Sequence, residues 1–214
     1  MPNYGPVDHI VLLAPSPSMA SKYVQSATGV TPGFGGKHVG NGSCNYLLSL
    51  GYKQYLEVFS PEEIQDGFVP LSKDEWCDIC RTLETPKPYT FCVATNDLQN
   101  LKSVLEHYDI VAEGPSDWQR VTADGSVLKW RLLTCDDSRF GPSLPFFIQW
   151  DDDCVHPSET APAGCHLTRL TVGSPLSEEL SAVFDSLNLD IPVYRSDLPA
   201  IQVELKCPKG LVTV

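Results

Sequence analysis

The stretch CNYLLSLGYKQYLEVFSPEE, residues 44–63, contains two apolar runs separated by a short break. The runs cover residues 44–50 and 54–59, and the gap that begins at Gly51 has the length of a β-hairpin loop. We therefore expect two adjacent strands here. Glu57 stands inside the second apolar run, where a buried carboxylate is costly unless it has a partner.

The residues before this hairpin indicate a strand and a helix. Residues 9–14 are apolar and end at a proline, and Ser18 can cap a helix that runs through Val24. The glycine-rich segment PGFGG, residues 32–36, indicates a turn, because it lacks the Lys-Ser/Thr pair of a phosphate-binding loop. Together with the hairpin, these segments predict a first βαβββ module over residues 1–61.

The same order of elements returns later in the chain. Residues 62–88 are rich in acidic residues and proline, and they indicate a linker with one short helix. Residues 89–152 predict a second βαβββ module, whose helix can begin at Asp97, and residues 153–214 predict a partial third module of order βαββ. The expected fold class is α+β, with paired, curved mixed sheets around one pocket and the third module packed on the pair.

The composition excludes several classes of partner. The chain of 214 residues carries 27 acidic and 15 basic side chains, a formal net charge of −12. Such a field repels phosphate backbones and anionic lipid surfaces, so neither nucleic acid nor a membrane is expected as a partner. The first thirty residues lack the basic start of a signal peptide, and no apolar run approaches the roughly 20 residues of a spanning helix. A cytoplasmic protein is expected.

Eight cysteines raise the alternatives of disulfides, redox chemistry and zinc binding. Without a secretory start, the thiols are expected to remain reduced. Cys77 and Cys80 have the spacing of a redox dithiol, but they lie in the middle of a helical pattern rather than at a helix start after a strand. A helix with two partly buried cysteines is the favoured interpretation, and no second pair stands at zinc-finger spacing.

Four ordered blocks of the sequence resemble the glyoxalase-like domain family of the vicinal-oxygen-chelate superfamily. They are DHIVLLAPS, GGKHVGNGSCNYLLSLGYKQYLEVFSPE, PFFIQWDDDCVHPS and AGCHLTRLTVGSP. The resemblance covers nearly the whole chain and implies paired βαβββ modules that form a cleft for a small molecule. It does not select a reaction, because this superfamily contains isomerases, lyases, dioxygenases, epimerases and binding proteins.

The resemblance also implies a divalent metal held by inward-facing side chains on the first and last strands of each module. By position, the first module supplies His9 and Glu57, whose nitrogen and oxygen donors suit zinc, nickel, manganese or iron. In the second module the corresponding positions hold Tyr89 and Gln149, which are weaker ligands. His166, at the start of the third module, is expected to complete the set.

Glu204, on a later strand of the third module, could join His166 if that module folds back against the first. Each candidate ligand also has a structural interpretation: a histidine can be tied to a neighbouring side chain at a strand edge, and a carboxylate can be buried with a partner. The candidate acid and base residues are Glu57, His38 and His156. The expected pocket walls are Tyr55, Tyr89, Phe147 and Trp150.

Three functions remain open from the sequence. The first is an isomerase or lyase that acts on a small oxygen-rich molecule by metal-assisted or general acid–base chemistry. The second is a metal-free protein that binds or sequesters a small molecule in the same cleft. The third is a metal-free cyclase or isomerase of specialised metabolism. An enzyme is favoured over a binding protein, and a homodimer is one expected assembly because such modules pair within or between chains.

Overall fold

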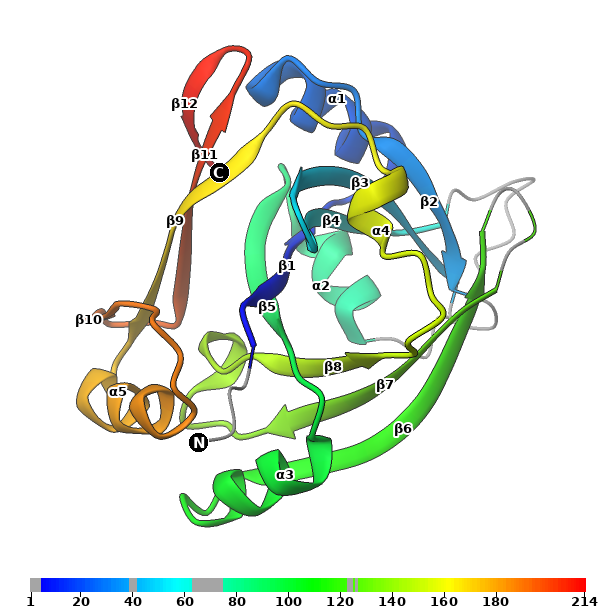
Figure 1. Ribbon diagram of the computed structural model, residues 1–214. Helices are drawn as coiled ribbons and strands as arrows, with labels where there is room; N and C mark the ends of the chain where they lie inside the picture. Colours follow the sequence, from blue (N-terminus) through cyan, green and yellow to red (C-terminus); the bar gives the residue numbers. More distant parts are fainter. Residues whose placement is uncertain (1–4, 39–41, 63–74, 123–124, 126) are drawn as a thin grey trace.

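The computed structural model describes residues 5–38, 42–62, 75–122, 125 and 127–214, and Figure 1 shows how they are arranged. The first module contains β1 (Val7–Leu13), α1 (Pro17–Thr28), β2 (Gly33–His38), β3 (Ser43–Gly51) and β4 (Gln54–Pro61). Helix α2 (Glu75–Thr82) precedes the second module, which contains β5 (Lys87–Ala94), α3 (Leu98–Glu106), β6 (Val111–Val121), β7 (Val127–Asp136), the short helix η1 (Gly141–Ser143) and β8 (Phe146–Trp150). The remaining elements are α4 (Pro157–Thr160), β9 (His166–Ser174), α5 (Ser177–Ser186), β10 (Val193–Arg195), β11 (Ala200–Cys207) and β12 (Gly210–Thr213).

The first two modules share one curved sheet. Its eight strands follow the order β2-β3-β4-β1-β5-β8-β7-β6, and the modules meet where β1 pairs antiparallel with β5. Each module repeats the same internal order on its side of this contact. The third module forms a separate sheet of order β10-β9-β11-β12. The structure thus confirms the α+β class with curved mixed sheets, and it adds one strand to the third module, which has the order βαβββ rather than βαββ.

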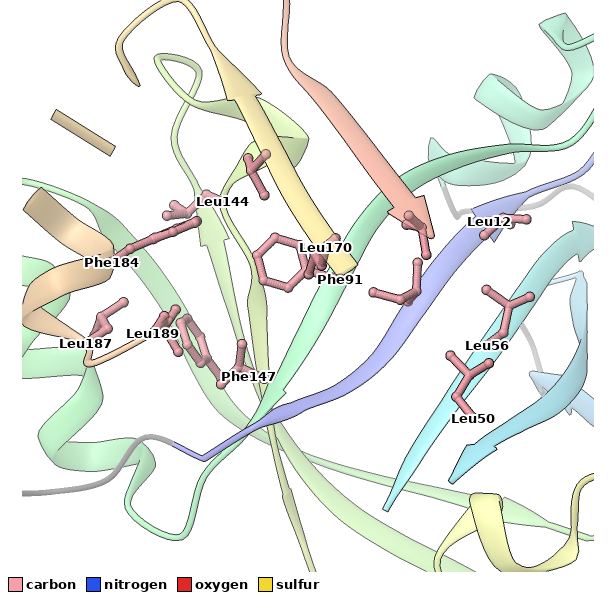
Figure 2. Close-up of a cluster of buried hydrophobic side chains, with 14 of the residues drawn as sticks. Leu12, Leu50, Leu56, Phe91, Leu144, Phe147, Leu170, Phe184, Leu187 and Leu189 are labelled. Atoms are coloured by element: carbon pink, nitrogen blue, oxygen red, sulfur yellow. The ribbon is translucent and has the colours of Figure 1, made fainter. Parts of the chain in front are cut away.

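The outer face of the large sheet carries the main hydrophobic core. Side chains alternate along a strand, so Ile10 and Leu12 of β1 point to this face and pack with Phe91 of β5. Leu170 of β9 and Phe184 of α5 belong to the same cluster, and Figure 2 shows them against the sheet. The third module therefore covers the outside of the curve, where it supplies apolar surface for the core.

The inner face of the large sheet receives helix α2, which lies inside the curve in Figure 1. Cys77 and Cys80 of this helix are fully buried and pack with Val11, Leu13 and Phe59. The CxxC motif is thus part of a helix that fills one end of the concave side, as the helical interpretation of this segment predicted. All eight cysteines of the chain are free thiols in the structure.

The helices are short, and none in the described part of the chain is long and apolar enough to cross a membrane. Asp97 caps α3 as predicted, because its carboxylate accepts the N–H of Asn100 at 3.0 Å. The start of α1 differs from the prediction. Ser16 rather than Ser18 is the cap, and its Oγ accepts the N–H of Met19 at 3.3 Å.

The two edges of the large sheet approach each other, since β6 contacts β2. Nη1 of Arg120 on β6 donates to Oδ1 of Asn45 on β3 at 3.0 Å, and both side chains are buried. Strand β2 passes over this pair at Gly35, where a Cβ atom would lie 2.4 Å from Oδ1 of Asn45 and 2.9 Å from Nη1 of Arg120. The prediction of a turn at PGFGG is therefore wrong. The segment is an edge strand whose missing side chain leaves room for the link between the two sheet edges.

Replacing Gly35 with alanine should weaken this closure. The added methyl group has no space beside Asn45 and Arg120, so either β2 shifts or the hydrogen bond breaks, and overpacking of this kind costs roughly 1–3 kcal/mol. Urea unfolding should detect the loss. As a control, Lys37→Ala removes an exposed ion pair with Glu62 from the same strand and should cost less than about 1 kcal/mol. Equal effects of the two variants would contradict this account.

Candidate active site

A cavity of about 730 Å³ lies on the concave side of the large sheet. Each strand of that sheet contributes at least one lining side chain, and α2 contributes Trp76. The volume falls in the range of small-molecule sites, roughly 300–1,000 Å³. This cavity is the candidate site, and the polar groups around Glu57 are its chemically distinctive part.

Glu57 reaches the cavity because it alternates with Leu56 and Val58, which point to the core on the opposite face of β4. Its side chain is 12% exposed. One carboxylate oxygen, Oε1, accepts the amide N–H of Asn45 at 2.7 Å, while Oε2 lies 3.5 Å from Nε2 of His9. The carboxylate thus has a polar partner on each oxygen and one side open to the cavity.

Behind His9 lies a fully buried carboxylate, Asp8, which is 1% exposed. Its Oδ1 is 2.7 Å from Nδ1 of His9, and its Oδ2 accepts Nε1–H of Trp150 at 2.9 Å and lies 3.1 Å from Nε2 of His156. Burial raises the pKa of Asp8, but the hydrogen bonds from His156 and His9 outweigh it and lower the pKa to about 2. Asp8 is therefore ionised at neutral pH.

The β1–β5 pairing explains how neighbouring residues both enter this network. Its register shifts between Val7 and His9, and such an irregularity redirects side chains that would otherwise alternate. The imidazole of His9 also stacks on Tyr55, with ring centroids 4.5 Å apart. These contacts give His9 a single orientation between Asp8 and Glu57.

His156 occupies a different place from the one predicted for a catalytic group. It is 4% exposed, and it caps α4 by accepting the N–H of Ser158 on Nδ1 at 3.2 Å. This bond leaves the proton on Nε2, which donates to Asp8. His156 does not line the cavity, because Tyr55 and Trp150 pack against its ring. The structure makes it a support of Asp8 rather than a group in contact with a substrate.

The proton on Nδ1 of His9 is held in the same way by Asp8. Nε2 of His9 consequently faces Glu57, and it can either accept a proton from a neutral Glu57 or donate one to its carboxylate. The pair can hold and exchange one proton at the cavity wall.

His38, the third predicted acid or base, also lies beside Glu57. Its Nε2 is 3.9 Å from Oε1 of Glu57 and 3.4 Å from the amide nitrogen of Asn45, while its Nδ1 is 2.9 Å from the hydroxyl oxygen of Ser43. Its ring stacks on Phe59. The structure therefore brings His9, His38 and Glu57 together at one wall of the cavity.

The predicted four-ligand metal set does not assemble. Gln149 alternates away from the cavity between Ile148 and Trp150, which both line it. His166 is exposed on β9 of the second sheet, outside the curve, and Glu204 of β11 lies in that same sheet. The third module does not fold back over the site because its apolar face packs against the outer core.

A divalent metal at this wall would have two of the predicted donors, Nε2 of His9 and the carboxylate of Glu57. No cluster of three or more His, Cys, Asp or Glu side chains suitable for a metal occurs in the described part of the chain. Nearby cavity positions on the second module hold Phe146 and Ile148, which have no donor atoms. His38 is a further nitrogen donor at this wall, but its Nε2 lies 3.9 Å from Oε1 of Glu57 and 3.4 Å from the amide nitrogen of Asn45, and the three side chains do not form a metal-binding group in the described part of the chain.

Three of the four predicted pocket walls line the cavity: Tyr55, Tyr89 and Trp150. Phe147 does not, because it is fully buried in the outer core, as Figure 2 shows. The neighbouring Phe146 takes the cavity position. Phe147 and Trp150 are three residues apart, so alternation along β8 places them on opposite faces of the sheet and only one of them can line the cavity.

Sequence reasoning missed Asn45 and Arg120 as site residues. Asn45 interrupts the apolar run of β3, which was a usable signal of a polar position facing a carboxylate. Arg120 gave no such signal, because it meets Asn45 across 75 positions of sequence. Asp8 gave no signal beyond its place next to His9 in the sequence.

Comparison with known proteins agrees with the fold. A family model described as a glyoxalase-like domain matches residues 7–187. A hypothetical protein from Staphylococcus aureus has a TM-score of 0.62 at 17% identity, with 97% of this chain and 83% of that chain covered. A mutant of 4-hydroxymandelate synthase from Streptomyces coelicolor has a TM-score of 0.54 at 11% identity, with 100% and 62% covered. Methylmalonyl-CoA epimerase from Mycobacterium tuberculosis has a TM-score of 0.45 at 11% identity, with 68% and 86% covered. No curated protein matches the chain.

Replacing Asp8 with asparagine should destabilise the protein by roughly 2–3 kcal/mol, because an amide cannot accept all three donors that reach the carboxylate. The pKa of Asp8 is below its ordinary value of 3.8, so its contribution is present above about pH 4 and is lost as the pH falls towards 2. Urea unfolding at pH 6, pH 4 and pH 2 measures both effects.

The exposed Asp185→Asn variant serves as the matched control and should unfold like the wild type. The Asp8→Asn variant should lose less stability than the wild type between pH 4 and pH 2, since it lacks the titrating group. A variant as stable as the control at pH 6 would show that Asp8 does not organise the site.

Proposed function

The chain belongs to the glyoxalase-like domain family, and we propose that it is an enzyme of isomerase or lyase type that moves a proton without a resident metal. Glu57 acts as the base on a carbon–hydrogen bond next to a carbonyl group. His9 receives and returns the proton. The observation that carries this proposal is the contact of the Glu57 carboxylate with the oriented Nε2 of His9 at the cavity wall.

In this arrangement the base, Glu57, is neither fully solvated nor held in a close ion pair. Asn45 orients the carboxylate of Glu57 by donating to Oε1, which leaves Oε2 towards His9 and the cavity. Asp8 in turn fixes the tautomer and the ring orientation of His9. Positioned groups of this kind accelerate proton transfer by about 10²–10⁴-fold.

The proposed reaction conserves its protons. The carboxylate of Glu57 removes the proton while the electron pair of the broken C–H bond moves to the carbonyl oxygen, and the resulting enolate is reprotonated at carbon or expels a leaving group. Tyr55 is a candidate donor to the enolate oxygen. Burial, with further contributions from Asp8 and Glu57, raises the pKa of Tyr55 well above its usual value, so the phenol keeps its proton.

A binding protein is the second candidate, and the aromatic content of the cavity favours it. Trp76 and Trp150 line the cavity together with Phe146 and Tyr89. Such walls bind a flat ligand whether or not chemistry follows. The two functions differ in a measurable way, since only an enzyme exchanges the substrate proton with solvent.

Glu57→Gln should abolish proton exchange and preserve folding, because the amide keeps the size of the side chain but cannot take up a proton. Aromatic ketones and aldehydes with an adjacent C–H bond would be incubated in D₂O with each protein, and deuterium incorporation would be followed by NMR. We expect catalysed exchange by the wild type and a loss of about 10²–10⁴-fold in the variant.

Glu106→Gln, on the exposed side of α3, is the matched control and should exchange like the wild type. Melting temperatures measured in parallel separate lost chemistry from lost folding. Exchange that persists in a well-folded Glu57→Gln protein would refute the role of Glu57. Ligand binding without exchange in the wild type would favour the binding protein.

Metal content provides a separate check. Because His9, His38 and Glu57 do not form a metal-binding group among the described residues, the purified untagged protein should contain zinc, nickel, manganese or iron well below one equivalent, and chelator treatment should leave exchange unchanged. Elemental analysis by plasma mass spectrometry before and after dialysis measures this. One tightly held equivalent, with exchange lost on its removal, would contradict the metal-free mechanism.

A further inference from the structure

We propose that the substrate of this site is an elongated aromatic compound that carries a protonated amine, and that anionic compounds of the same shape bind more weakly. The inference rests on the proposed function in so far as the ligand is called a substrate. Its grounds are the tryptophans and the charges of the cavity, of which, in the described part of the chain, Trp118, Trp130, Glu113 and Asp136 form no hydrogen bond or ion pair with Glu57 or His9.

A row of tryptophans crosses one wall of the cavity. Trp118 of β6 pairs with Trp130 of β7, which pairs with Trp150 of β8, so the three side chains stand at the same level on neighbouring strands. The rings of Trp130 and Trp150 have centroids 5.4 Å apart. With Trp76 of α2, all four tryptophans of the chain line this cavity.

None of the four indoles belongs to the main cluster on the outer face. Trp76 packs on the inner cluster and Trp150 donates to Asp8, whereas Trp118 and Trp130 belong to neither hydrophobic cluster. The exposed fraction of Trp118 is 41%, so its ring is available to a ligand. Indole faces bind flat aromatic rings and also attract cations through their negative π face. The row of tryptophans therefore predicts an aromatic ligand, and it is compatible with a positive charge on that ligand.

The same wall becomes acidic towards the end of β7. Side chains of Trp130, Thr134 and Asp136 share the cavity face of this strand, and Glu113 of β6 pairs with Thr134. Trp130 and Asp136 are six residues apart, about 20 Å along a strand. Among the described residues, no ion pair reaches Glu113 or Asp136. A ligand long enough to extend from the indoles meets two carboxylates.

Basic groups do not compensate this charge. Lys129 and Arg131 alternate to the other face of β7 and do not line the cavity. Arg120 is the single Lys or Arg among the described lining residues, and it is buried and donates to Asn45. The net charge of −12 adds a field of the same sign. A phosphate or carboxylate ligand would meet repulsion, whereas an ammonium group gains attraction at the acidic end.

Three probes with the same aromatic body test the charge preference. They are 6-(1-naphthyl)hexylamine, 6-(1-naphthyl)hexanol and 6-(1-naphthyl)hexanoate, which end in an ammonium, a hydroxyl and a carboxylate group at pH 7. Calorimetric titration at low salt should give the tightest binding for the amine, about tenfold tighter than for the carboxylate, with the alcohol between them. Added salt should reduce this difference.

Two variants locate the effect. Glu113→Gln/Asp136→Asn should bring the amine to the affinity of the alcohol, whereas Glu106→Gln/Asp185→Asn makes the same change of net charge at exposed helix positions and should keep the order of the three probes. Trp118→Leu should weaken all three probes by about tenfold and leave their order unchanged.

Binding is measured without turnover, so this inference and the proposed function can fail separately. No binding by any probe would overturn the aromatic class, and equal or tighter binding of the carboxylate would overturn the charge preference, even if Glu57→Gln has lost proton exchange. A preference for the amine in a protein that shows no exchange would support the ligand class and reject the enzyme.

Discussion

The buried carboxylate of Asp8 connects the first strand to a region of the chain more than 140 residues later. It accepts hydrogen bonds from His9 on β1, from Trp150 on β8 and from His156 at the start of α4. An ionised group with almost no exposure is stable only when such donors replace water, because each unmet charge or donor costs about 1–3 kcal/mol or more. The position of β8, the course of the α4 segment and the orientation of His9 therefore depend on one another.

This network separates the support of the site from the groups that can contact a ligand. His156 and Asp8 lie behind the cavity wall, whereas His9 and Glu57 face it. A carboxylate behind a histidine is a recurrent way to set the tautomer of the ring and the direction of its free nitrogen. The arrangement gives the proposed proton transfer a fixed geometry without requiring Asp8 to exchange a proton itself.

The two modules repeat one topology but contribute different chemistry to the cavity. The first supplies polar groups, with Asn45 and Glu57 on adjacent strands. The second supplies aromatic surface, with Trp130 and Trp150 at paired positions. A metal shared symmetrically by both modules would need donors on both halves, so the replacement of donors by indoles changes what the same sheet can bind. The two modules therefore share a backbone topology but not the side chains that form the site.

The local pattern of residues was enough to predict the strands and helices and their order. Two apolar runs with a short break predicted the β3–β4 hairpin, and the repeated order of elements predicted two modules in one α+β fold. Both signals depend on residues that are close in the sequence. The inward direction of Glu57 was an implication of the family resemblance, whereas its place in an apolar strand indicated only that the carboxylate needs a partner. These features depend on contacts within a module.

Other features depended on which faces of the modules meet, and local periodicity does not contain that information. Gln149 was assigned to the cavity by its correspondence with Glu57 and Phe147 as an aromatic wall, but both point to the outer face of β8. His166 was assigned to the site although the third module packs on the outer core. The link of Arg120 to Asn45 across the closing sheet, and the donation from Trp150 and His156 to Asp8, arise from long-range contacts. Burial on one face of a curved sheet decides these contacts, and it is a property of the assembled chain.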